Sequence, residues 1–156
     1  MVKPVESAVV EYFAEQQCSR QWKGFLRVLA EEFAQQLPEA DLQALMRRLG
    51  HRLALAHPLP ACRTLDELQL AMGRVWVSQD WGWVALAEVP GSLRISHFCA
   101  PLFTALGPQS AGWAPAFLEG VYQAWFEQSH AGGLTVRHVS GPDAAGSVEL
   151  RLEMSR

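Results

Sequence analysis

Several features that would place this 156-residue sequence in a common functional class are missing from it. It contains no run of basic residues and has a net charge of -3, so nucleic acid is not an expected partner. No apolar stretch reaches the ~18 residues that a membrane span needs. The sequence therefore predicts a protein with neither a membrane span nor a nucleic-acid partner.

Cysteine is scarce and follows no pattern. Cys18, Cys62 and Cys99 are odd in number and far apart, which predicts neither a disulfide framework nor a C-x-x-C motif. The N-terminal residues lack the apolar segment of a secretory signal, because Glu6 and Glu11 interrupt them. We therefore expect a cytoplasmic rather than a periplasmic protein, in a compartment that keeps thiols reduced.

The usual catalytic and cofactor-binding motifs are also missing. The sequence has no Gly-rich phosphate loop, no G-x-S-x-G motif and no pair of histidines four residues apart on a helix. His97 and His138 are expected to be core or interface residues, with a metal or acid–base role as the alternative. Glu119 is expected to pair with a neighbouring subunit, with a role as a proton donor as the alternative. We therefore predict no enzymatic activity, no cofactor and no metal.

What the sequence has in excess is apolar and aromatic side chains. Apolar residues make up 49% of it and charged residues only 19%, and six tryptophans are many for this length. A chain of about 150 residues forms a single core with limited room for such large rings. Some of these rings should therefore lie in contacts between copies of the chain, because aromatic residues are enriched at such interfaces.

Hydrophobic periodicity predicts helices in the first half of the chain and mainly strands in the second. Apolar residues recur at helical spacing in residues 4–17, 20–36, 38–53 and 64–76. Alternation of apolar and polar residues predicts two hairpins, made of residues 81–89 with 92–97 and of residues 134–138 with 147–154. Residues 113–130, between the hairpins, form a helix that is apolar nearly all round and should be buried. The predicted fold class is α+β: N-terminal helices plus an antiparallel sheet of about four strands, with a buried helix between two hairpins.

Two sets of residues are candidates for contacts between copies. A stripe of small residues along the buried helix would let another element approach closely, and it consists of Ala116, Gly120 and Ala124. Trp81 and Trp83 share one face of the first strand, both faces of which look covered. A core or interface role and stacking against sugar rings are both open for these two rings.

Six short motifs, in their order and spacing, resemble those of one protein family. They are Phe25-Leu26, Pro60-x-Cys62-x-Thr64-Leu65-x-Glu67-Leu68, Trp81-Gly82-Trp83-Val84, Leu93-Arg94-Ile95-Ser96-His97, Trp113-Ala114-Pro115-x-Phe117-Leu118-Glu119-Gly120-Val121-Tyr122-x-x-Trp125 and Leu150-Arg151-Leu152. Residues 24–156, which contain them, are similar to the family of the bacterial cellulose synthase operon protein D, the small accessory protein of cellulose synthase operons. Because the start of the chain matches poorly, we expect an N-terminal extension at 1–20 and a single domain at 21–156.

The resemblance implies a function that the residues alone do not show. It implies a non-catalytic subunit that assembles into an octameric ring and organises synthase complexes or glucan chains for cellulose export and crystallisation. The implied partners are further copies of the chain, other cellulose synthase subunits, a proline-rich operon partner and glucan chains. N-terminal segments line the passageways of such a ring, so the candidate glucan-facing residues are Val5, Val9 and Tyr12.

A second likeness predicts a different function. Phe117-Leu118-Glu119-Gly120 near a sheet is similar to the vinyl-reductase-type fold, which binds small ligands or partners. A module of this type would enclose a pocket at Trp81 and Trp83. The two hypotheses therefore differ in whether these rings contact another copy or a bound ligand.

Overall fold

The computed structural model describes residues 5–155 of the chain and the side chains of residues 6–155. Four helices come first: α1 (Val5–Gln16), α2 (Arg20–Gln36), α3 (Glu39–Ala56) and α4 (Leu65–Ser78). The second half consists of β1 (Trp83–Val89), β2 (Ser92–Phe98), α5 (Leu102–Leu106), the 3-10 helix η1 (Pro108–Gly112), α6 (Ala116–Gln128), β3 (Leu134–Ser140) and β4 (Val148–Met154). The predicted α+β class is confirmed.

Local sequence signals set several of the helix boundaries. Pro38 is the N-cap of α3 and follows the last residue of α2 by two positions. At the start of α4, the Thr64 hydroxyl accepts a hydrogen bond from the backbone N–H of Glu67 at 3.1 Å, as the capping box predicts. The Glu67 carboxylate accepts in turn from the backbone N–H of Arg63, one residue earlier than in the standard motif.

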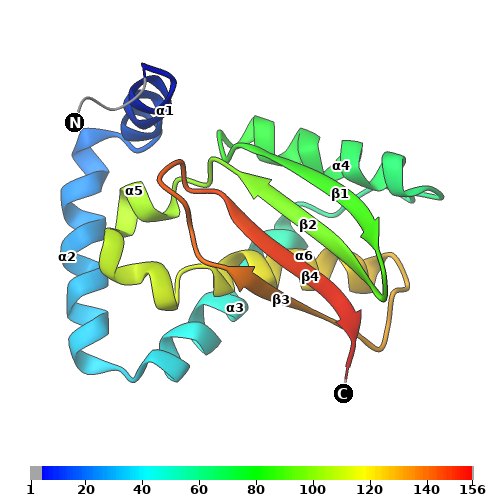
Figure 1. Cartoon of the computed structure of the whole chain (residues 1–156). Coiled ribbons are helices and arrows are strands. Elements are labelled where there is room, and N and C mark those ends of the chain that lie inside the picture. Colours follow the sequence, from blue (N-terminus) through cyan, green and yellow to red (C-terminus); the bar gives the residue numbers. More distant parts are fainter. Residues whose placement is uncertain (1–4, 156) are drawn as a thin grey trace.

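The four strands form one antiparallel sheet in the order β1-β2-β4-β3. The two predicted hairpins are β1–β2 and β3–β4, and they join through β2 and β4 at the centre of the sheet (Figure 1). Helix α6, which lies between the hairpins in the chain, packs against one face, which we call the inner face. The predicted buried helix between two hairpins is therefore confirmed.

The core lies between α6 and the inner face of the sheet. Nine residues of α6 are buried, so the helix is enclosed on nearly all sides, as its apolar sequence predicts. Trp76 of α4 is fully buried beside it and contacts Trp125 of α6 and His97 of β2 edge-on. The sheet supplies Ile95, Leu150 and other alternate residues of its strands. The aromatic excess of the sequence is thus used in part to fill this core.

Helices α3 and α6 cross very closely because each carries a glycine at the crossing. A Cβ atom on Gly120 would lie 2.1 Å from the carbonyl oxygen of Arg47, and one on Gly50 would lie 2.0 Å from the carbonyl oxygen of Phe117. Each glycine therefore lets the backbone of the other helix approach where no side chain would fit. This crossing fixes α3 as a second layer behind α6 (Figure 1).

The opposite face of the sheet, which we call the outer face, is not covered by any helix of residues 5–155 (Figure 1). The prediction that both faces of the first strand are covered is therefore wrong. The strand also begins later than predicted, at Trp83, because Gly82 adopts a positive φ of 77° that ends the extended backbone. The segment between β2 and α6, for which hydrophobic periodicity predicts neither helix nor strand, contains α5 and η1.

Candidate functional site

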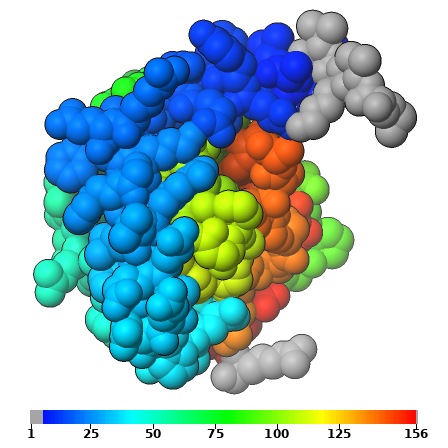
Figure 2. All heavy atoms as spheres, turned by 90° about the vertical axis from the view of Figure 1, so that its left-hand side faces the viewer, coloured from blue at the N-terminus to red at the C-terminus, as the bar shows by residue number. Residues whose placement is uncertain are grey.

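Many of the exposed large apolar side chains of the described chain lie on α1 and α2. They include Val9, Val10, Tyr12 and Phe13 of α1 and Trp22, Phe25 and Val28 of α2, which we call the helical apolar surface. Phe13 is 63% exposed and Val28 66% exposed, so these side chains are left in water by the single chain. Figure 2 shows this side of the molecule, with α1 and α2 spread across it. Exposed apolar side chains gathered in this number make the two helices a candidate for contact with another molecule.

One ion pair ties α1 to α2. The ammonium group of Lys23 contacts the carboxylate of Glu15, and this contact holds the pKa of Glu15 below its ordinary value. The side chain of Glu15 is well exposed, so the pair contributes little to stability. This pair therefore adds little to the stability of the arrangement of α1 on α2.

An apolar groove of about 290 Å³ opens between α2 and the body of the protein. Its walls are entirely apolar and come from α2, α3 and the segment containing α5 and η1, with Leu29, Phe33, Met46 and Leu102 among the lining residues. Trp81 and Phe117 also line it, with their rings 5.1 Å apart. The groove can accept an apolar side chain or a small apolar ligand, and it offers no polar group to orient a reacting substrate.

The structure separates Trp81 from Trp83, which the sequence placed on one strand face. Trp81 is half-buried, stacks on Trp76 and lines the apolar groove. Trp83 projects from the outer face of the sheet, is 52% exposed and stacks on Phe98. The shared ligand pocket predicted at these two rings is therefore not formed, and only Trp83 has a ring open to a flat ligand or a partner.

The predicted stripe of small residues faces the inside of the molecule. Ala116, Gly120 and Ala124 are buried, and Gly120 lies against the backbone of α3 at Arg47. The close approach expected from the spacing thus takes place, but with a helix of the same chain. We therefore do not include these three residues in the surface for contacts between copies.

The candidate glucan-facing residues lie at the start of the chain. Val9 and Tyr12 are exposed on α1 and belong to the helical apolar surface. The side chain of Val5 lies outside the described residues. Their exposure is compatible with contact to another copy or to a glucan chain.

His97 belongs to a buried polar network in the core. Its Nε2 lies 2.8 Å from the carbonyl oxygen of Trp81, and its Nδ1 lies 2.6 Å from the hydroxyl of Tyr122. Because a carbonyl oxygen only accepts, Nε2 donates the proton and Nδ1 accepts from Tyr122. Burial lowers the pKa of His97 to about 4, against the opposing effect of the Trp81 carbonyl. His97 is therefore a neutral residue whose two nitrogens are both satisfied, and it joins β2, α6 and the segment before β1.

Glu119 forms the second buried polar cluster. Its Oε2 accepts a hydrogen bond from Nε of Arg47 at 2.7 Å, and its Oε1 accepts from the backbone N–H of His138 and lies 2.5 Å from Nδ1 of that residue. Burial alone would raise the pKa of Glu119, but the bonds from His138 and Arg47 outweigh it and hold the pKa below its ordinary value. Glu119 is therefore a carboxylate paired within its own chain, and the prediction of a partner in a neighbouring subunit is wrong.

The two histidines that sequence reasoning considered together are held apart. His97 is opposite Val148 and His138 is opposite Leu150, so β4 runs between them. Glu119 and His138 do converge, beside a hollow of about 400 Å³ that Arg47, Arg48 and His51 also line. Among residues 5–155, no group of three His, Cys, Asp or Glu side chains is placed to hold a metal ion.

Side chains from the helices occupy the free edges of the sheet. On β3, Gln123 of α6 accepts from the N–H of Val136 and donates to the carbonyl of Leu134, and Glu119 accepts from the N–H of His138. On β1, Gln69 of α4 accepts from the N–H of Leu86. Exposed edges of this kind can pair with strands of other molecules. These bonds assign Glu119 a structural task that sequence reasoning missed, because no local pattern indicates which edge a helix will face.

Comparison with known proteins assigns the chain to a family. A family model for the D subunit of cellulose synthase matches residues 8–153. The chain is 31% identical over 103 residues to cellulose synthase operon protein D of Komagataeibacter xylinus, and 30% identical over 104 residues to the protein of that name from Komagataeibacter sucrofermentans. Each match covers 65% of this chain and 66% of the relative, just under two thirds of its length. The chain belongs to the family of the cellulose synthase D subunit.

Proposed function

We propose that this protein is a non-catalytic accessory subunit of a bacterial cellulose synthesis and secretion complex. It forms a homo-oligomeric, octameric scaffold that organises synthase complexes or glucan chains for cellulose export and crystallisation. The observation that carries this proposal is the helical apolar surface, because a single chain leaves it in contact with water. Membership of the family supports the link to cellulose synthesis.

A closed octamer with dihedral symmetry needs two different kinds of contact between copies. The helical apolar surface supplies the first. The exposed side of α4 is a candidate for the second, because Leu70 and Val77 are exposed there and Gly73 lies between them with no atom near its missing side chain. Copies of the chain would bury both surfaces on assembly.

The location we propose is the cytoplasmic side of the inner-membrane complex. The three cysteines are all free thiols, which is typical of a reducing compartment. Within residues 5–155, no helix is long and apolar enough to cross a lipid bilayer. Association with the membrane would then depend on other subunits of the complex, with a proline-rich partner or a glucan chain as further contacts.

Light scattering coupled to size-exclusion chromatography tests the scaffold. The wild-type protein should elute as an octamer, and the double substitution Phe13→Ser with Phe25→Ser should reduce its mass, because both rings are exposed on the helical apolar surface. Leu55→Ser is the matched control, since Leu55 is as exposed as Phe25 but lies on α3. A wild-type protein that stays monomeric at micromolar concentration would remove the proposal.

The apolar groove favours a second candidate function, a vinyl-reductase-type module that binds a small ligand or partner. Its lining contains Trp81 and is apolar throughout, as expected for a site that takes a hydrophobic ligand. Quenching of tryptophan fluorescence by a fatty acid, in a protein that remains monomeric, would support this candidate over the scaffold. An octameric protein whose tryptophan fluorescence does not change with the ligand would exclude this candidate and favour the scaffold.

A further inference from the structure

Three arginines form a row across the outer face of the sheet. Arg94 of β2 is directly opposite Arg151 of β4, and Arg151 is directly opposite Arg137 of β3. The neighbours Ile95, Leu150 and Val136 point to the inner face and are buried, so the three arginine side chains share the outer face. The row is formed only when the two hairpins join, because Arg94 belongs to the first hairpin and Arg137 and Arg151 belong to the second.

Such a row is unfavourable in an isolated chain. Side chains of directly opposite residues have Cβ atoms about 5 Å apart, and like charges at that spacing destabilise a sheet. Only Arg151 has an ion-pair partner, the carboxylate of Glu149 at 2.7 Å. Arg94 and Arg137 are exposed and make no ion pair with any carboxylate of residues 5–155. The face therefore presents two arginine side chains whose charge is not matched.

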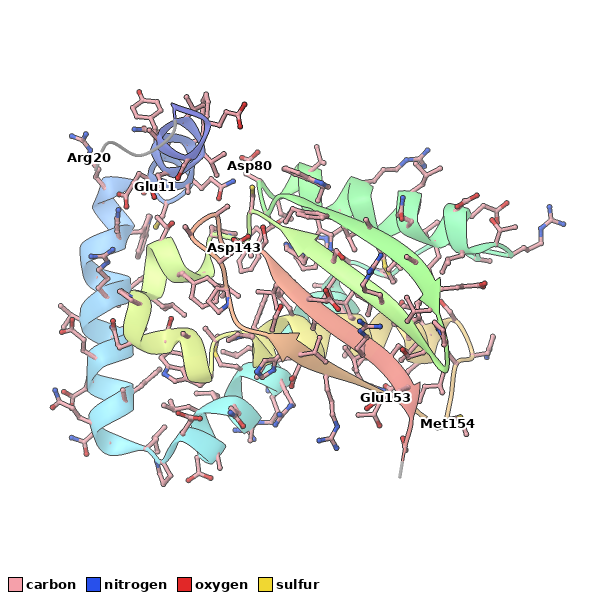
Figure 3. The ribbon with its side chains drawn as sticks, viewed as in Figure 1. Glu11, Arg20, Asp80, Asp143, Glu153 and Met154 are labelled. Carbon is pink, nitrogen blue, oxygen red and sulfur yellow. The ribbon has the colours of Figure 1, made fainter. Side chains whose placement is uncertain are left out.

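The charge of the outer face contrasts with that of the whole protein. The carboxylates on this face are those of Glu149 and Glu153, and Figure 3 shows Glu153 towards the end of β4. With three arginines against two glutamates the face is positive, whereas the chain as a whole has a net charge of -3. An acidic partner would thus be attracted to this face and repelled by the protein elsewhere.

An aromatic pair lies near the same row. Trp83 of β1 and Phe98 of β2 are directly opposite one another, and their rings stack with centroids 5.4 Å apart. Next to Trp83 on the same face are Ala85 and Ala87, whose small side chains leave the indole ring of Trp83 accessible. Tryptophan and arginine are the side chains most enriched among the residues that dominate binding energy at protein interfaces.

We propose that the outer face of the sheet is a docking surface for an acidic segment of another protein. Carboxylates of that segment bind Arg94 and Arg137, and an apolar side chain of it packs on the Trp83–Phe98 pair. The mixture of charge with an exposed aromatic anchor is typical of contacts between different proteins that associate and separate. The helical apolar surface, in contrast, has the composition expected for contacts between copies.

Fluorescence anisotropy with a labelled peptide of alternating glutamate and alanine tests this proposal. The wild-type protein should bind the peptide at low salt and release it at high salt, because exposed charges are screened within about 10 Å at 0.1 M salt. The double substitution Arg94→Gln with Arg137→Gln should weaken binding about fivefold, as expected for the loss of two exposed ion pairs. Trp83→Ser should weaken only peptides to which a leucine has been added.

Matched controls separate this surface from general electrostatic attraction. Arg52→Gln with Arg74→Gln removes two exposed arginines from α3 and α4 and should leave binding unchanged. Equal weakening by both double variants, no binding of the acidic peptide by the wild type, or binding of cello-oligosaccharides in its place would overturn the proposal. Sedimentation of the same samples measures the oligomer. If Arg94→Gln with Arg137→Gln dissociates the oligomer, the outer face binds a second copy of the chain and the docking proposal is wrong. A wild-type protein that is monomeric and still binds the peptide contradicts only the proposed scaffold and not the docking surface.

Discussion

Replacing Gly120 by alanine should destabilise the protein even though alanine is the better helix former. The added Cβ would lie 2.1 Å from the carbonyl oxygen of Arg47, where ordinary van der Waals contacts begin at 3.4 Å. The conflicting atom belongs to the backbone of α3, so no side-chain rotation relieves it and the two helices must separate. Overpacking of this kind costs up to about 3 kcal/mol.

The helical preference of alanine opposes this cost. Alanine exceeds glycine by about 1 kcal/mol in a helix interior, so the net loss at position 120 should be about 2 kcal/mol. For a chain of this size that loss lowers Tm by roughly 4 to 8 °C. Urea and thermal unfolding followed by circular dichroism, at matched protein concentration, measure both quantities.

A second glycine provides the control. Gly73 of α4 has no atom within 4 Å of its missing Cβ, so Gly73→Ala gains the helical preference without a clash and should stabilise the protein by about 0.5 to 1 kcal/mol. If Gly120→Ala proves as stable as Gly73→Ala, the close crossing of α3 and α6 does not exist as described.

Two further predictions concern the buried polar groups. Stability should fall by up to about 3 kcal/mol as the pH drops from 6.5 towards 4, because the unfolded chain protonates His97 while the folded chain keeps it neutral. Glu119, with its lowered pKa, adds to the loss only below its ordinary value of 4.5, so urea midpoints that stay constant between pH 6.5 and 4.5 would contradict the assignment of His97. Gln123→Leu should cost about 1 to 3 kcal/mol, because it leaves the N–H of Val136 without its acceptor. Hydrogen exchange at Val136 should then accelerate more than at Val148 in the central strand β4, and equal rates in variant and wild type would mean that the bond contributes nothing.

The elements with a clear period could be predicted from the sequence. The segment 20–36 coincides with α2, and the capping box at Thr64 starts α4, because both signals act within one or two helical turns. The short helix α5 was missed, since five residues are too few for a helical period to be recognised and prolines surround it. Trp81 was misplaced because a single positive φ at Gly82 changes the direction of the chain.

The polar contacts of the site could be predicted less well. Glu119 was recognised as a buried carboxylate that needs a partner, but Arg47 lies 72 residues away in the chain and only the helix crossing brings it near. The arginine row was not foreseen for the same reason. Strand alternation shows that Arg94, Arg137 and Arg151 point away from the core, but only the sheet order and register place them side by side.

The side-chain bonds at the edges of the sheet have a consequence for the proposed assembly of several copies. Subunits joined through the helical apolar surface, as proposed, would be at high local concentration, where an open strand edge could pair with the strands of neighbouring copies. The side chains of Gln123 and Glu119 bond to three backbone groups of β3, and that of Gln69 bonds to one N–H of β1, so these groups are not free to pair with another strand. In the proposed oligomer, copies would then associate through their helices rather than by pairing of strands.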